Sequence, residues 1–157
     1  MPVLSNEIKY YGSGASNLGG AKSGTEVNFS TLFDNVEPAE AVAGDTEYRI
    51  IYVENTSATD SLTAAKFFVV TDTVAGNTSI EIGVGAAAVN GTESTIANEN
   101  TAPAGVTFSA PTTKVGGLDI PDLAPGDYKS ICYKRSIGAG ASSGSESATT
   151  EISGNDS

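Results

Sequence analysis

Acidic side chains offer the most chemistry in this sequence, and they gather in two segments. The later segment holds Asp119, Asp122 and Asp127, and the earlier one holds Asp34, Glu37, Glu40 and Asp45. Calcium binds about six to eight oxygen ligands, which loops of this kind can supply. Neither segment contains the D-x-[DN]-x-[DN]-G pattern of an EF-hand loop. We therefore interpret both as solvated acidic loops and expect no bound metal and no cofactor, with calcium binding as the alternative.

The residues that most often carry catalysis are missing. The sequence contains no histidine, which removes the usual general base and the usual zinc ligand. It also lacks the G-x-S-x-G, S-x-x-K and Walker A motifs, and no G-x-G-x-x-G stands between a strand and a helix. The single cysteine, Cys132, lies in a strand-like run between Ile131 and Tyr133, so we expect a buried, unreactive thiol. We predict that the protein is not an enzyme.

The charge of the chain restricts its partners. A net charge of −11, with 8 basic residues, repels nucleic acid backbones and anionic membranes. No apolar run approaches the roughly 18 residues that a membrane span requires, and the first residues lack the basic and apolar regions of a signal peptide. We expect neither nucleic acid nor membrane as a partner, and synthesis and folding in the cytoplasm.

The elements that must position these residues are β-strands, because β-branched and aromatic residues dominate the apolar runs. Tyr48–Val53 and Ala65–Val70 are apolar on both faces and are joined by a mostly polar connector. This pattern predicts a central hairpin, covered on one side by a second sheet and partly on the other. Thr78–Val84 alternates cleanly with period two. Pro125-Gly126 predicts a type II turn before a long strand, Tyr128–Ile137.

Weaker patterns complete the expected fold. We predict short strands at Glu7–Tyr11, Val27–Phe33, Val106–Ser109 and Ser147–Ile152, and an edge segment at Leu118–Leu123. We expect a loop over Asp34–Asp45, with one helical turn at Pro38–Val42 as the alternative, and a long excursion or a ribbon over 86–105. The fold class is all-β, an antiparallel immunoglobulin-like β-sandwich of about 7–9 strands with a flexible N-terminal arm. The predicted core side chains are Ile50, Tyr52, Phe67, Val69, Ile80, Ile82, Ile131 and Tyr133.

The N-terminal segment is the candidate binding region. We divide the chain into an arm, residues 1–21, and one sandwich domain, residues 22–157. Glycine and serine are frequent within Asn6–Ala21, so the isolated segment buries too little apolar surface to offset its ordering entropy. We predict an arm that a partner orders, with the anchors Ile8, Tyr10, Tyr11 and Leu18. The alternative is that the two tyrosines cap one edge of the sandwich.

Several stretches resemble small structural proteins of tailed-bacteriophage virions. They are Leu18-Gly-Gly20, Leu32-Phe-Asp34, 44–49 leading into Tyr52-Val53, Asn90-Gly-Thr-Glu93, 96–103, Gly105-Val-Thr-Phe-Ser109, and Leu123-Ala-Pro-Gly126 before a strand with Lys134-Arg135. Together they span roughly residues 18 to 137. The resemblance implies a virion protein with a β-sandwich fold, a capsid decoration or cement protein that binds the outer shell and stabilises it. It brings no active site.

The same resemblance implies partners and a location. The partners are the major capsid protein or other virion proteins, with self-association for which a trimer is one geometry. The protein would be made in the host cytoplasm and reside in the virion. A tail-associated or receptor-binding β-sandwich module that recognises a host surface is the alternative, so head or tail stays open. The absence of tryptophan, a residue common in carbohydrate clefts, favours the structural reading.

Overall fold

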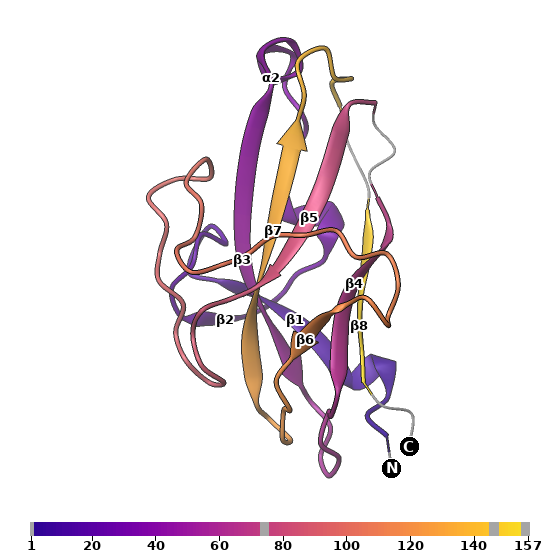
Figure 1. The fold of residues 1–157 in the computed structure, drawn as a ribbon. Coiled ribbons are helices and arrows are strands. Elements are labelled where there is room, and N and C mark those ends of the chain that lie inside the picture. The colour runs from indigo at the N-terminus through magenta and orange to yellow at the C-terminus, as the bar shows by residue number, and fades with distance from the viewer. Residues whose placement is uncertain (1, 73–75, 145–147, 155–157) are drawn as a thin grey trace.

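The computed structural model describes residues 2–72, 76–144 and 148–154 and shows an all-β protein (Figure 1). The strands are β1 (Ile8–Ser13), β2 (Lys22–Glu26), β3 (Asp45–Asn55), β4 (Ala65–Thr71), β5 (Thr78–Val84), β6 (Leu118–Ile120), β7 (Tyr128–Ile137) and β8 (Thr149–Ser153). Helix in the described residues is confined to a 3₁₀ turn, Ser5–Glu7, and to two short α-helices, α1 (Phe29–Leu32) and α2 (Pro38–Ala43). None of these helices has the length and apolar character needed to cross a bilayer.

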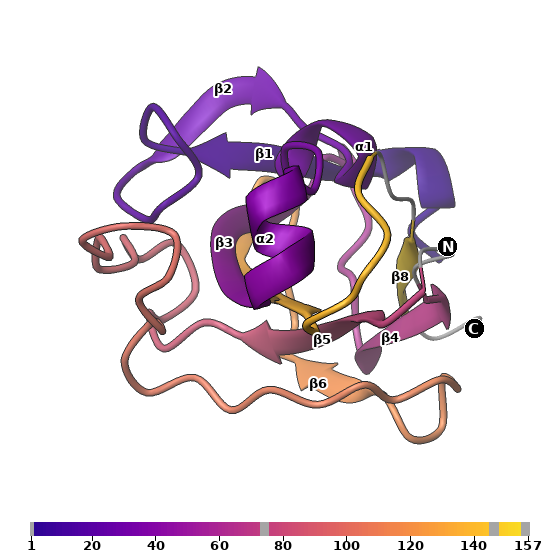
Figure 2. The same cartoon turned by 90° about the horizontal axis from the view of Figure 1, so that it is seen from above.

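The strands form two antiparallel sheets. The larger sheet has five strands in the order β2-β1-β3-β7-β5, and the smaller has three in the order β6-β4-β8. β3 and β7 make the longest pair, with ten residues of each strand in register. Seen from above, α2 lies over the end of β3 (Figure 2). The predicted all-β class and antiparallel pairing are confirmed.

The main hydrophobic core lies between the two sheets. It contains Ile51, Ile82 and Ile131 from the larger sheet and Phe67 and Ile152 from the smaller one. All eight side chains predicted for the core are buried, with at most 3% of their surface exposed.

The second face of the larger sheet is also covered, as the two-sided apolar pattern of β3 predicted. Ile50 and Cys132 pack there against Ile96, from the long irregular segment between β5 and β6. The predicted excursion over residues 86–105 forms no strand, and Glu93 makes a single bridge to Gly20.

The predicted hairpin of Tyr48–Val53 with Ala65–Val70 is wrong. β3 pairs with β1 and β7, whereas β4 belongs to the smaller sheet. The connector, residues 56–64, crosses from one sheet to the other, and Asn55 anchors it by donating from Nδ2 to the carbonyl oxygens of Asp60 and Leu123, at 2.8 and 2.9 Å. Periodicity reports the face that a side chain occupies but not the neighbour of its strand, so the sequence pattern could not reveal this crossover.

Two local predictions are also corrected. The expected strand Val27–Phe33 contains α1, and the expected loop Asp34–Asp45 contains α2. A backbone bond closes the first of these helices, with Thr31 N–H donating to the Asn28 carbonyl at 3.2 Å. α2 has proline in its first turn, and the Glu40 carboxylate accepts from Glu37 N–H at 2.7 Å, both of which favour the start of a helix. Val106–Ser109 forms no strand and contributes only a bridge from Ser109 to Ile82.

Other local predictions are confirmed. Asp127 N–H donates to the Ala124 carbonyl at 2.9 Å and Gly126 has a φ of 85°, as the type II turn requires. The predicted edge segment holds β6, at the edge of the smaller sheet. The last strand begins at Thr149, while the predicted start at Ser147 lies outside the described residues.

The predicted N-terminal arm, residues 1–21, differs from the structure. β1 lies inside the larger sheet and pairs with β3 from Ile8 to Tyr11. The following glycine-rich turn folds over the outer face of β3, where Ile50 N–H donates to the Asn17 carbonyl at 2.8 Å. Composition alone suggested that the segment could not offset the entropy lost when it becomes ordered. Backbone pairing with β3 and the burial of the inward side chains of β1 do offset this loss. The segment is therefore an integral strand and cover of the larger sheet.

Candidate functional site

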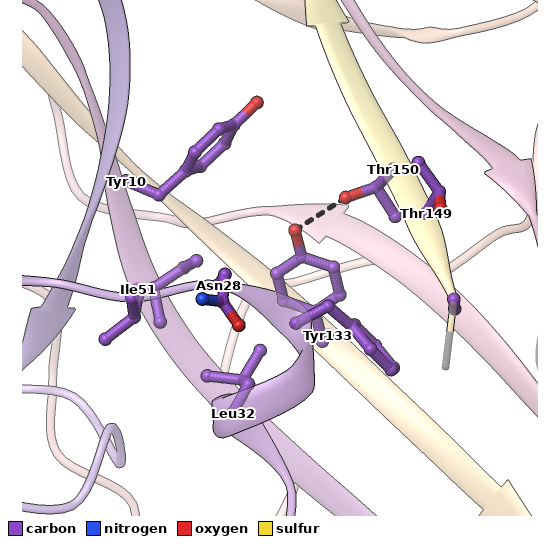
Figure 3. A pocket seen from close by; sticks show the side chains of 10 residues that line it. Tyr10, Asn28, Leu32, Ile51, Tyr133, Thr149 and Thr150 are labelled. Carbon is purple, nitrogen blue, oxygen red and sulfur yellow. Dashed lines mark hydrogen bonds between the residues drawn. The ribbon is translucent and has the colours of Figure 1, made fainter. Parts of the chain in front are cut away.

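A pocket of about 210 Å³ lies between β8 and the segment that carries β1 and α1 (Figure 3). Alternation along β1 turns Tyr10 toward the main core, and the short helix α1 brings Leu32 to the same place. Ile51 of β3, Tyr133 of β7 and Thr150 of β8 also line it, so residues from five separate elements build the pocket.

The polar side chains that line the pocket carry hydroxyls and one amide, that of Asn28. The Tyr133 hydroxyl and Thr150 Oγ1 lie 2.8 Å apart in a hydrogen bond (Figure 3). Burial raises the pKa of Tyr133, and burial also raises the pKa of Tyr10 to about 12, although a hydrogen bond with the Ile152 backbone opposes that change. Both phenols are therefore protonated at neutral pH. They can donate hydrogen bonds but cannot act as bases.

The size and lining of the pocket suit the binding of a side chain. No acidic, basic or thiol side chain is found among the described residues that line it. Its volume is below the roughly 300–1,000 Å³ typical of small-molecule and cofactor sites. An apolar side chain of a partner would fit, with the hydroxyls at its margin.

A second pocket, of about 160 Å³, lies beside the other half of β8. Ile8, Leu62 and Ile152 line it, whereas the first pocket takes residues 148–150. β8 pairs with β4 and with no second strand in the described part of the chain. One edge of β8 therefore runs between two pockets; we call this region the β8 groove.

The four predicted anchors are not brought together. Ile8 and Tyr10 lie two residues apart on one face of β1 and line the two pockets of the β8 groove. Tyr11 stacks instead under Lys22, whose Nζ lies 4.0 Å from the ring centroid. Leu18 packs against the cluster on the outer face of the larger sheet. Sequence reasoning missed the part that Tyr133 and Thr150 play in the groove, because alternation indicates burial and not the presence of a pocket.

The carboxylates of the later acidic segment, Asp119, Asp122 and Asp127, do not form a common site. Asp119 pairs with Lys66, Asp122 accepts from Ala64 N–H at 3.1 Å, and Asp127 accepts from Ala124 N–H at 3.1 Å. Each carboxylate therefore serves a different local contact, and this segment offers no ligand set for a metal.

The earlier acidic segment instead joins a buried ion cluster that sequence reasoning missed. Glu47, fully buried, pairs with Arg135, and Arg49 pairs with Glu99 at 2.8 Å. The Phe33 ring lies near both guanidinium groups, 4.9 Å from that of Arg49 and 4.8 Å from that of Arg135. Burial raises the pKa of Glu47 to about 7 and outweighs the opposing effect of Arg135. The sequence did contain a signal for this cluster. Residues 45, 47 and 49 alternate with period two and so share a face of the strand with the apolar Ile51, which indicates that they are covered too.

Cys132 is buried, as predicted, and burial raises the pKa of its thiol. The thiolate needed for nucleophilic attack or metal binding is therefore strongly disfavoured.

The chain was also compared with known proteins. No protein-family model matches it, and the comparisons with curated proteins and with solved structures find no match.

Proposed function

We propose that the protein is a structural component of a bacteriophage virion, a capsid decoration protein that binds the outer shell and stabilises it. The observation that carries this proposal is the β8 groove, an unpaired strand edge flanked by two pockets. Such an edge binds an extended segment of another protein by adding a strand to the sheet. Main-chain hydrogen bonds supply affinity, and the pockets select the side chains.

The spacing of the two pockets supports this mode of attachment. Alternate side chains of a strand point to the same face and lie about 7 Å apart. Residues 148–150 border one pocket and residues 151–154 the other, so an extended segment beside β8 can place one side chain in each. The proposed partner is the major capsid protein or another virion protein.

Further features of the protein fit a coat that is not an enzyme. The hydroxyl-lined pocket is suited to binding, and a net charge of −11 keeps a surface protein away from packaged nucleic acid. We place the two sheets in the immunoglobulin-like class of sandwiches. We also infer synthesis in the host cytoplasm, location in the virion, and self-association of the protein on the shell, for which a trimer at a three-fold axis is one geometry.

The copy number in purified virions tests this proposal. Quantitative mass spectrometry of particles from the phage that encodes the chain should find hundreds of copies per virion. A handful of copies would overturn the decoration role in favour of the tail-associated or receptor-binding module. Absence from the particle would overturn the virion role altogether.

A further inference from the structure

Three carboxylates meet where α2 joins β3. One carboxylate oxygen each from Glu40, Asp45 and Glu47 lies within 4.8 Å of the other two. Gly44 sets this geometry: with a φ of 81° it turns the chain from helix into strand, and its N–H donates to the Glu40 carbonyl at 2.6 Å. Asp45 and Glu47 then project from the same face of β3, because alternate residues of a strand do so.

The Glu47 side chain, which belongs to this group, has one oxygen without a partner among the described residues. Its exposed surface is 0%, and Oε2 contacts the Arg135 guanidinium. The other oxygen, Oε1, is buried and has no hydrogen-bond partner among the described residues. A buried carboxylate oxygen without a partner costs on the order of 1–3 kcal/mol, so native proteins rarely leave one unmatched.

A second group of three carboxylates also includes Glu47, but arginine side chains pair with its members. Asp34 and Glu99 also come within 4.8 Å of Glu47, but Arg49 and Arg135 pair with them. Around Glu40 and Asp45, in contrast, the described residues contain no ion pair; Glu40 accepts from Glu37 N–H, and Asp45 accepts from Thr46 N–H and from the amide of Asn100. The two arginines therefore pair with three of the five carboxylates, and Glu40 and Asp45 have no cation among the described residues.

We propose that Glu40, Asp45 and Glu47 bind a calcium ion, with Glu47 Oε1 as its innermost ligand. The donor set is all oxygen, as a hard divalent cation prefers, and bidentate carboxylates with water can reach the six to eight ligands that calcium takes. Glu40 and Asp45 are half-buried, so an ion and its remaining waters can enter from solvent. The site clamps α2 to the first residues of β3, and it is independent of the proposed virion role.

Thermal unfolding of the full chain, first stripped with a chelator, tests the site. Titration with calcium chloride to about 10 mM spans the affinities of weak protein sites. At a calcium concentration about 100 times Kd, the Tm should rise by roughly 5–10 °C. Sodium chloride at matched ionic strength should leave the Tm unchanged, and calcium should stabilise more than magnesium, which demands a tighter octahedral shell.

Asp45→Asn is the decisive variant, because it removes a ligand charge with little change of shape, and Glu40→Gln provides a second variant should the first fail to fold. Both should lose the calcium-dependent rise in Tm. Asp119→Asn is the matched control outside the site and should keep it. No rise in the wild-type protein, an equal rise with sodium chloride, or a rise that survives both ligand substitutions would overturn the proposal.

Discussion

β3 and β7 pass through two contrasting regions along a single face. At one end, Ile51 and Ile131 lie in the apolar core opposite the smaller sheet. At the other end, Glu47 and Arg135 are equally buried but charged, and the segment with α1 and Phe33 covers them. The same pair of strands therefore carries an apolar core and an ion cluster next to each other on one face.

The two kinds of burial have different requirements. Apolar side chains are stabilised by removal from water whatever their neighbours, in proportion to the area buried. A buried carboxylate needs an opposite charge and hydrogen bonds, or it changes its protonation or binds an ion. The apolar region should therefore respond to lost volume, whereas the ion cluster should respond to lost partners, to pH and to calcium.

The largest expected effect comes from breaking the central ion pair. Arg135→Met leaves Glu47 buried without its cation and should lower the free energy of unfolding by about 3–5 kcal/mol, measured by urea denaturation at a pH above 7. The double variant Glu47→Leu with Arg135→Met should recover most of this loss. Phe67→Ala, in the apolar region, should cost a similar amount, about 3–5 kcal/mol, through lost volume. If the double variant is no more stable than Arg135→Met, the loss does not come from leaving Glu47 buried without its cation.

The second prediction concerns pH in protein kept free of divalent cations. Burial raises the pKa of Glu47 from 4.5 to about 7, while Arg135 and Arg49 oppose the shift and Glu99 adds to it. The folded protein thus holds a proton that the unfolded chain loses between these pH values. Stability should fall as pH rises from about 4.5 to 7, by on the order of 1–3 kcal/mol. Glu47→Gln should remove this slope, and an unchanged slope would contradict the assignment.

A smaller effect is expected at the β8 groove. Tyr133→Phe removes the hydroxyl that bonds Thr150 and should cost about 1 kcal/mol. Thr150→Val provides the partner substitution for a double-mutant cycle by chemical denaturation. Additive losses would show that the hydroxyls do not interact in solution.

The smallest effect is expected for the reactivity of Cys132 with a thiol reagent. This measurement tests how well the residues packed on the outer face of β7 shield the thiol. Ile50 and Ile96 pack around the thiol, and burial raises its pKa. A thiol reagent at neutral pH should leave the native protein unmodified and label it only when urea unfolds it. Labelling of the native protein at the rate of an exposed cysteine would show that this cover opens.

The sequence was most informative where apolar density was high. The strands rich in isoleucine, valine and aromatic residues, and the turn at Pro125-Gly126, were predicted because each depends on local preferences. The pairing of β3 was not, since a strand's neighbour depends on how connectors cross between sheets. Prediction also failed at Val27–Phe33, where α1 replaces the strand that alternation indicated, and at Asp34–Asp45, where α2 stands in place of the favoured loop.

The candidate site was less predictable than the fold. Ile8 and Tyr10 were predicted to be contact residues, and they lie in β1, where a short strand had been predicted at Glu7–Tyr11. The groove itself arises where β1, α1, β7 and β8 meet, and such a meeting of distant segments leaves no local pattern. Glu47 was missed for the same reason, because its burial depends on Arg135, 88 residues away.

Attachment through the β8 groove is tested most directly by binding purified protein to particles of its phage that lack it. Ala148→Phe fills the first pocket, and Val115→Phe adds the same ring at a site that is 93% exposed; thermal unfolding checks that both variants fold. In cosedimentation, the wild type and Val115→Phe should bind equally, and Ala148→Phe should bind at least about tenfold more weakly, a loss of roughly 1.4 kcal/mol. Equal binding by all three would contradict attachment through the β8 groove.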